Sequence, residues 1–168
     1  AYMLLTSLAL VLLNLVSATT TRELMFRAKY ASAQDKMQVA ASAFSGVDPL
    51  TEETVGQVIS VLGDLNVTRL IVTNAEGTAL YDSSENQNAA GKRILLPAVA
   101  QALAGNDVFH SVYREDALLS YAAVPIMNRE APSGCVYMME YDAEQGNVIA
   151  NLERTIFQVS LILLGAII

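Results

Sequence analysis

The chain has a long apolar stretch at each end and patterned, more polar sequence between them. Residues 1–18 are apolar apart from a few hydroxyl and amide side chains, and Arg22 is the first charged residue. A helix that crosses a bilayer needs about 20 largely apolar residues. We therefore expect residues 1–20 to form a transmembrane helix. The alternative is a cleaved signal peptide, because residues 16–18 (V-S-A) resemble a cleavage site.

The C-terminal stretch supports the uncleaved alternative. Residues 157–168 are uncharged and strongly apolar, so we expect residues 155–168 to be the start of a second transmembrane helix that continues beyond Ile168. A buried C-terminal helix is the other interpretation. Two such helices would place residues 21–154 as one domain on one side of a membrane, with both chain ends on the other side.

Residues 22–44 predict a helix with one apolar seam, because large or small apolar residues recur at alternating spacings of four and three. The seam either lies on the domain's own sheet or forms a homodimer contact, and both can hold along different parts of it. The six seam residues are Phe26, Tyr30, Ala33, Met37, Ala40 and Phe44.

A second helix is predicted after a break at Gly46 and Pro49. Thr51 is a favourable N-cap, and Glu52 and Glu53 lie where the helix dipole favours acidic side chains. The apolar face of this helix would consist of Val55, Val58, Ile59, Leu62 and Leu65.

Residues 67–83 predict a β-hairpin, which we place at the centre of a small sheet. The β-branched run 70–72 leads into a turn at residues 74–77 (N-A-E-G), and a short strand follows at 79–81. Asn and Gly supply the backbone angles that such a turn needs.

The rest of the domain predicts one further helix and three further strands. A polar loop at 83–91 precedes a short helix at 95–104. Strands are expected at 107–113, 117–127 and 135–142, with turns at 114–116 and 128–134, and a helix from 143 onward. Strands joined by short turns favour an antiparallel sheet, here with the helices gathered on one side. The predicted fold class is α+β.

Composition excludes several kinds of site. Seventeen acidic residues against 10 basic residues give a net charge of −7, which argues against a nucleic-acid partner. One cysteine and one histidine leave no internal disulfide and no multi-histidine or cysteine-rich metal site, so we predict no metal and no cofactor. His110 and Cys135 have no catalytic partners in the sequence pattern. We predict no catalytic residue, and this fragment is not expected to be an enzyme.

Four segments carry a family resemblance through their order between the two apolar ends. They are residues 71–83 (I-V-T-N-A-E-G-T-A-L-Y-D-S), 101–105 (Q-A-L-A-G), 119–126 (L-S-Y-A-A-V-P-I) and 134–141 (G-C-V-Y-M-M-E-Y). This arrangement resembles the single Cache (PAS-like) extracytoplasmic sensor domain of bacterial membrane receptors, above all sensor histidine kinases.

The resemblance implies a five-stranded antiparallel sheet with a long N-terminal helix that continues from the first membrane span. It implies a small-molecule or peptide ligand on the sheet face, beneath the loop and helix between the second and third strands. A histidine kinase parent would carry its catalytic core in the cytoplasm and act on a response regulator. The Arg-x-Trp-Tyr pattern of amino-acid-binding double Cache domains is absent, because the chain has no Trp. The ligand therefore does not follow from the resemblance.

The candidate ligand contacts are polar or aromatic residues on the predicted strands and the covering loop. Ordinary core or surface roles are the alternative for each, and Arg69 can pair with an acidic neighbour instead. A membrane-anchored interaction module without a pocket, and a chemotaxis or cyclic-dinucleotide receptor, are the alternative functions. The candidate residues are Tyr81, Asp82, Arg93, His110, Tyr113, Tyr121 and Tyr137.

Overall fold

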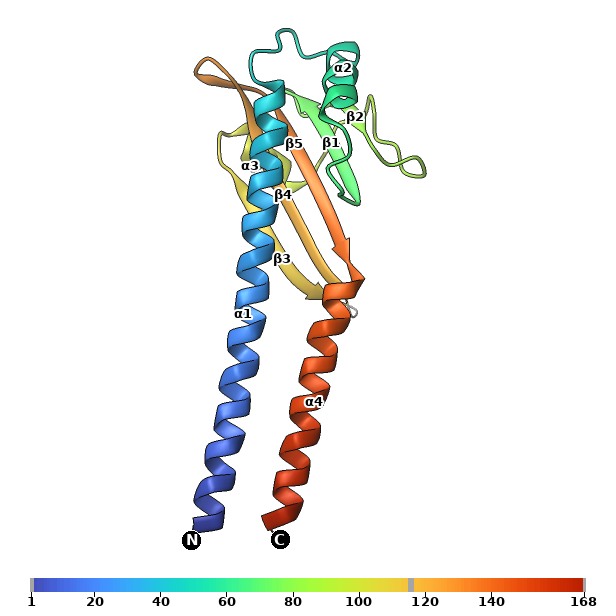
Figure 1. The fold of residues 1–168 in the computed structure, drawn as a ribbon. Coiled ribbons are helices and arrows are strands. Elements are labelled where there is room, and N and C mark those ends of the chain that lie inside the picture. The colour runs from blue at the N-terminus through green and yellow to red at the C-terminus, as the bar shows by residue number, and fades with distance from the viewer. Residues whose placement is uncertain (1, 115–116, 168) are drawn as a thin grey trace.

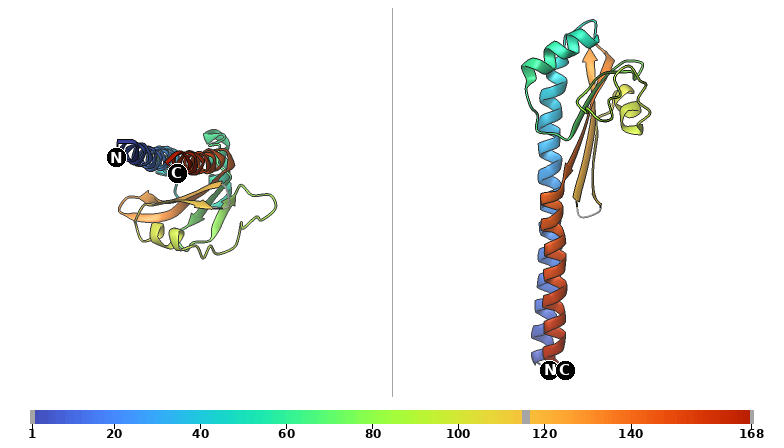
Figure 2. Two further views of the ribbon diagram at one scale, coloured as in Figure 1. Left: turned by 90° about the horizontal axis from the view of Figure 1, so that it is seen from below. Right: turned by 90° about the vertical axis from the view of Figure 1, so that its right-hand side faces the viewer.

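The computed structural model describes residues 2–114 and 117–167 of the chain, and its main feature is a sheet carried on two long helices. The first helix, α1 (Tyr2–Phe44), is continuous from the N-terminal end to the far edge of the sheet. The last helix, α4 (Ala143–Ile167), begins directly after the last strand. Figures 1 and 2 show the two helices side by side below the sheet, with both chain ends at the same end of the molecule.

The five strands form one antiparallel sheet in the order β2-β1-β5-β4-β3. Their bounds are β1 (Arg69–Asn74), β2 (Ala79–Asp82), β3 (Val108–Arg114), β4 (Ala117–Asn128) and β5 (Ala131–Asp142). The expected five-stranded antiparallel sheet with a long N-terminal helix is confirmed. The hairpin of β1 and β2 lies at one edge, however, because the C-terminal strand β5 inserts beside β1. Our placement of this hairpin at the centre of the sheet is wrong.

Each face of the sheet has its own apolar core, and helices cover both faces. On one face α1 and α2 (Glu52–Leu62) pack against residues such as Val72, Val136 and Met138. On the other face α3 (Pro97–Leu103) packs against Ile71, Ala123 and Tyr137. The expectation that all helices lie on one side is therefore wrong. We call the two sides the α1 face and the α3 face.

The turns that define the sheet follow from local chemistry. Asn74 Oδ1 accepts hydrogen bonds from the backbone N–H of Glu76 (3.1 Å) and Thr78 (2.9 Å), and Gly77 has a φ of +79°. Thr51 caps α2 as predicted, with its hydroxyl accepting from the Thr54 N–H at 3.2 Å.

The predicted turn at 128–134 is much shorter in the structure. The hairpin turns at residues 129–130, and Pro132 and Gly134 lie inside β5. A Cβ atom on Gly134 would collide with the backbone oxygen of Thr73 on β1. Gly134 therefore permits close strand contact rather than a turn. Two residues of the turn predicted at 114–116, Glu115 and Asp116, lie outside the described residues.

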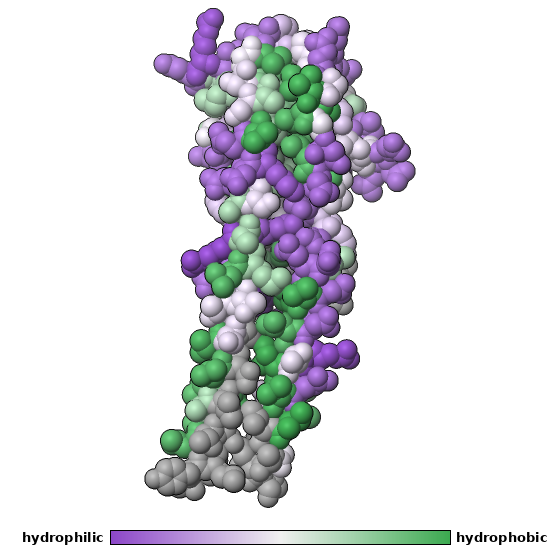
Figure 3. All heavy atoms as spheres, in the orientation of Figure 1, coloured by the Kyte–Doolittle hydropathy of each residue, from purple (hydrophilic) through white to green (hydrophobic). Residues whose placement is uncertain are grey.

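Apolar side chains are exposed along the ends of α1 and α4 that project away from the sheet. In Figure 3 the hydrophobic surface follows both helices below the sheet. These exposed residues include Leu5, Leu13, Val16, Phe157, Leu161 and Ile162. Among the residues that the structure describes, no helix combines the length and the apolarity needed to cross a membrane.

Candidate ligand-binding site

A pocket lies between α3 and the sheet, on the α3 face. Its cavity volume is about 280 Å³. Strand alternation places Tyr121 of β4 and Tyr137 of β5 on this face, since Tyr137 is paired with Ala123 and Tyr121 with Met139. We call this cavity the α3 pocket. Its lining residues are Leu96, Pro97, Ala98, Gln101, Val108, Tyr121 and Tyr137.

Helix α3 lies over the sheet because one of its sides is apolar and small. Ala98, Val99 and Ala102 are buried against the sheet, and Pro97 starts the helix at a position where its missing N–H is not needed. Small residues bring the helix close to the strands. The larger side chains at the pocket rim then have space between helix and sheet.

Two tyrosines and Gln101 supply the polar side-chain groups of the pocket. Burial raises the pKa of Tyr137, and the nearby charge of Arg69 only partly opposes this effect. Tyr137 is therefore a neutral phenol at physiological pH. The ring of His110, which is exposed on β3, lies 5.0 Å from the ring of Tyr121 between centroids. This contact supports the orientation of Tyr121.

An ion pair beside the pocket fixes the loop that leads to α3. Arg69 donates from Nε to Asp82 Oδ1 at 3.0 Å and from Nη2 to Asp82 Oδ2 at 2.7 Å. The Asp82 side chain is fully buried and also accepts from the N–H groups of Ser84 (3.0 Å) and Ala89 (2.8 Å). Arg69 reaches the carbonyl of Gln87 at 2.8 Å. Asp82 thus organises the polar loop around itself.

Burial acts to raise the pKa of Asp82, but the hydrogen bonds from Arg69, Ser84 and Ala89 outweigh burial and hold that pKa below its ordinary value. The pairing of Arg69 with an acidic neighbour, one of the two interpretations from the sequence, is what the structure contains. Both carboxylate oxygens of Asp82 accept hydrogen bonds from the protein, so Asp82 anchors the loop.

The structure brings some of the seven candidate ligand contacts together and separates others. Tyr121 and Tyr137 line the pocket, and His110 and Asp82 lie near it on the same face. Tyr81 packs into the core of the α1 face, since it pairs with Val72. Tyr81 and Tyr121 therefore lie on opposite faces of the sheet.

The remaining two candidates lie elsewhere. Tyr113 is on the α1 face of β3, in register with Leu118, because it alternates with His110 along the strand. Arg93 is exposed and forms an isolated backbone bridge with Thr78, the residue before β2. Neither lines the α3 pocket.

Sequence reasoning missed Gln101, which is the polar residue that α3 contributes to the pocket. A signal was available, because Pro97, Ala98 and Gln101 are spaced by three and four residues and so share one side of the predicted helix. The side of the helix that faces the strands could not be chosen without knowing which face of the sheet α3 covers.

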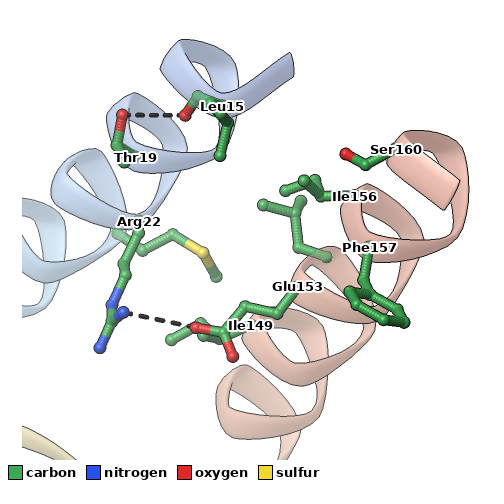
Figure 4. Close-up of a pocket in the computed structure, with 10 residues that line it drawn as sticks. Leu15, Thr19, Arg22, Ile149, Glu153, Ile156, Phe157 and Ser160 are labelled. Atoms are coloured by element: carbon green, nitrogen blue, oxygen red, sulfur yellow. Dashed lines mark hydrogen bonds and ion pairs between the residues drawn. The ribbon is translucent and has the colours of Figure 1, made fainter. Parts of the chain in front are cut away.

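A second hollow lies between α1 and α4, well below the sheet. It has a cavity volume of about 320 Å³ and is mainly apolar. Figure 4 shows Leu15 and Thr19 of α1 opposite Ile156 and Ser160 of α4. An ion pair between Arg22 Nη1 and Glu153 Oε1 at 3.3 Å joins the two helices at one end of this hollow.

A buried charge cluster ties α1 to the end of β5. Lys29 Nζ lies 2.7 Å from Glu140 Oε1 and 2.9 Å from Asp142 Oδ2. Only 7% of the Lys29 side chain is exposed, against 15% for Glu140 and 20% for Asp142. Asp142 is the last residue of β5, and α4 begins at the next residue. We call this cluster the Lys29 clamp.

The predicted dimer seam is mostly occupied by the chain's own sheet. Ala33, Met37, Ala40 and Phe44 are buried in the core of the α1 face. The other seam residues are Phe26, which is half-buried, and Tyr30, which is 47% exposed and touches Phe109. These four residues pack against the domain's own sheet, which is one of the two interpretations of the seam given by the sequence.

Comparisons with known proteins give matches among solved structures only. No family model matches the chain, and no curated protein matches it. An extracellular ligand-binding receptor from Desulfohalobium retbaense superposes with a TM-score of 0.61 at 12% identity, over 80% of this chain. The sensor domain of Escherichia coli DcuS superposes with a TM-score of 0.52 at 12% identity, over 72% of this chain and 96% of that chain. The fold is that of a Cache-like sensor domain.

A third similar structure carries a ligand. It is the ligand-binding domain of the Pseudomonas aeruginosa amino acid chemoreceptor PctC, in complex with GABA, with a TM-score of 0.56 and 13% identity over 86% of this chain. This chain spans 26% of the Desulfohalobium receptor chain and 64% of the PctC chain. At these identities the likeness concerns the sensor fold alone.

Proposed function

We propose that the chain is the extracytoplasmic signal-sensing domain of a membrane-bound sensor histidine kinase, and that it transmits ligand binding by helix movement. The observation that carries this proposal is the direct path from pocket to helix. Tyr137 lines the α3 pocket on β5, and the same strand ends at Asp142, where α4 begins without a linker. At about 3.3 Å per residue, the pocket and the helix are roughly 17 Å apart along one strand.

The sensor domains with the same fold support this proposal. They include the sensor domain of the Vibrio cholerae histidine kinase DctB, with a TM-score of 0.54 and 13% identity over 84% of this chain. In a kinase parent, the catalytic core would follow α4 in the cytoplasm and would act on a response regulator. A chemoreceptor is the second candidate, because the PctC domain superposes equally well with a TM-score of 0.56.

Residues 1–20 and 155–168 are proposed to anchor the domain in the membrane at both ends, with residues 21–154 outside the cytoplasm. The support is the surface of the two helices. Leu13 is 69% exposed, Val16 62%, Phe157 69% and Ile162 71%. Soluble surfaces rarely carry contiguous apolar patches of this kind. Lipid or neighbouring helices would cover these side chains.

Transmission would follow from two arrangements of α1 and α4 that a ligand binds unequally. A ligand shifts their populations only by its difference in affinity for the two arrangements. Contacts to Tyr137 would bear on β5, and β5 reaches α1 through the Lys29 clamp and α4 through the chain itself. A small displacement of β5 would therefore change the position of one helix against the other.

A homodimer would use the outer side of α1, since the inner side is buried. Leu24 is 60% exposed and Val39 is 56% exposed, and both lie on the side opposite Met37. In membranes, single cysteines in the variants Leu24→Cys and Val39→Cys should cross-link between chains, whereas Glu85→Cys on the exposed loop should not. Equal cross-linking at all three positions, or none, would argue against this dimer.

The test of the sensing function is ligand-dependent stability of the full chain in detergent, measured by thermal unfolding against a library of amino acids, carboxylates, alcohols and amides. A ligand at 100 times its Kd adds about 2.7 kcal/mol, which is roughly 5–10 °C in Tm for a domain of this size. Gln101→Trp should fill the α3 pocket and remove the shift, whereas Asn106→Trp, beyond α3, should keep it. If no compound separates these two variants, the proposal fails, and an interaction module without a pocket replaces it.

A further inference from the structure

The α3 pocket is small and carries no charged side chain among its lining residues. Its volume of about 280 Å³ is at the lower limit of typical ligand pockets, which span roughly 300–1,000 Å³. The occupant is therefore a small molecule rather than a peptide. Apolar contacts come from Leu96, Pro97, Ala98 and Val108, and the polar groups come from Gln101 and the two tyrosines.

The polar groups of the pocket are neutral and available. Within the described residues, neither the Tyr121 nor the Tyr137 hydroxyl is hydrogen-bonded to another protein group. A phenol donates one hydrogen bond and accepts others, and the Gln101 amide does both. These groups match a ligand that carries a hydroxyl or an amide.

Arg69, whose charge acts on Tyr137 of the pocket, is already paired. Arg69 makes two hydrogen bonds to Asp82, at 3.0 and 2.7 Å, and one to the Gln87 carbonyl. If Arg69 turned toward a ligand carboxylate, it would leave the fully buried Asp82 carboxylate without its partner. Uncompensated burial of a charge is far more costly than one ion pair gains. A carboxylate in the α3 pocket would therefore meet no cation among the lining residues and could not recruit Arg69 without this cost.

We infer that the α3 pocket binds a small uncharged molecule, an apolar ring or short chain with a hydroxyl or amide group, and selects against carboxylates. This inference rests on the proposed sensing function of the same pocket. It separates this chain from the PctC domain, which was solved with the zwitterion GABA. Burial of Tyr137, which raises the pKa of its phenol, keeps that hydrogen-bond donor protonated when the ligand binds.

Three probes of nearly the same shape test the charge preference, namely benzamide, benzoate and benzamidinium. Binding to the full chain in detergent would be followed by the backbone amide signals of residues 97–108 and 121–137 in ¹H–¹⁵N NMR spectra. Benzamide should bind at least tenfold more tightly than benzoate, because the carboxylate loses its hydration without gaining a cation. Equal or tighter binding of benzoate or benzamidinium would overturn the inference while leaving the sensing function intact.

Matched variants separate the pocket from the detergent and from the rest of the surface. Tyr121→Phe and Tyr137→Phe should each weaken benzamide about threefold to tenfold, which is the loss of one hydrogen bond. Tyr141→Phe, which removes the hydroxyl of a 52% exposed tyrosine on the same strand as Tyr137, should leave binding unchanged. If none of the three probes perturbs the signals of the α3 pocket in the unsubstituted chain, the inference and the proposed function both fail.

Discussion

Replacing Lys29 tests whether the clamp holds α1 against the end of β5. In Lys29→Met the carboxylates of Glu140 and Asp142 remain buried but lose their shared cation, and Glu140 keeps only the longer contact to Lys36 Nζ at 3.6 Å. Removing one partner of a buried ion pair costs about 3–5 kcal/mol. Because the carboxylates are 15% and 20% exposed, we expect the lower value, about 3 kcal/mol.

The measurement is thermal and urea unfolding of the full chain in detergent. A loss of about 3 kcal/mol corresponds to a fall in Tm of roughly 6–12 °C. The matched control is Arg22→Met, which removes the exposed ion pair between α1 and Glu153 of α4. Those side chains are 48% and 54% exposed, so this change should cost less than about 1 kcal/mol.

The pH dependence of the same variant has a definite sign. Burial acts to lower the pKa of Lys29, but the hydrogen bonds to Glu140 and Asp142 outweigh it and raise that pKa above its ordinary value of 10.5. Burial acts to raise the pKa of Asp142, but the Gln145 N–H and Lys29 bring it below its ordinary value of 3.8. The Lys29 contribution to stability is therefore lost as the pH rises through its folded pKa, and the Asp142 contribution as the pH falls through its own.

The stability difference between the unsubstituted chain and Lys29→Met should thus be largest between about pH 5 and pH 10, and smaller at either extreme. The triple variant Lys29→Met, Glu140→Gln, Asp142→Asn removes the three charges of the Lys29 clamp and should recover most of the loss, since the remaining cation, Lys36, is 24% exposed and stays hydrated. The reasoning would be refuted if Lys29→Met unfolded within about 0.5 kcal/mol of the unsubstituted chain, a change that ordinary surface substitutions produce. A triple variant as unstable as the single one would also refute it.

Three further predictions follow from single contacts. Arg69→Met should destabilise the chain by about 3 kcal/mol and speed hydrogen exchange at the Ser84 and Ala89 amides, whereas Arg93→Met at an exposed position should do neither. Gly134→Ala should cost at least about 2 kcal/mol in urea unfolding because its Cβ meets the Thr73 oxygen; Gly56→Ala, with open space in α2, should stabilise by about 0.5–1 kcal/mol. Cys135, whose burial raises its pKa to about 12, should resist iodoacetamide at pH 8 until the chain unfolds, and rapid alkylation of the native chain would contradict its placement in the core.

Local chemistry was readable from the sequence wherever a residue acts on its immediate neighbours. Thr51 as an N-cap, the Asn74 turn and the helical seam through Met37 all depend on contacts a few residues apart. The fold class and the order of elements along the chain followed from these signals.

The spatial order of the strands and the assignment of faces could not be read in this way. Insertion of β5 beside β1 is a contact between distant segments, and no local pattern specifies it. The pairing of β1 with β2 shifts its register between Val72 and Thr73. Tyr81 pairs with Val72 and so lies on the α1 face, whereas Asp82 pairs with Ile71 and lies on the α3 face. Since side chains alternate, the face of one strand fixes that of its neighbour only once the register is known. The pocket residue Gln101 was missed for the same reason.

Helices α1 and α4 extend side by side from the same end of the sheet (Figure 1). The folded lobe could therefore be transferred as one unit to another pair of helices. Within the described residues, the lobe joins the projecting part of α1 near Arg22 and the projecting part of α4 near Glu153. A graft into another pair of antiparallel helices needs only the rotational phase of those two junctions to be kept, since each added residue turns a helix by about 100°. For the proposed sensor, the ligand-binding lobe could then be exchanged while the two helices that it moves are kept.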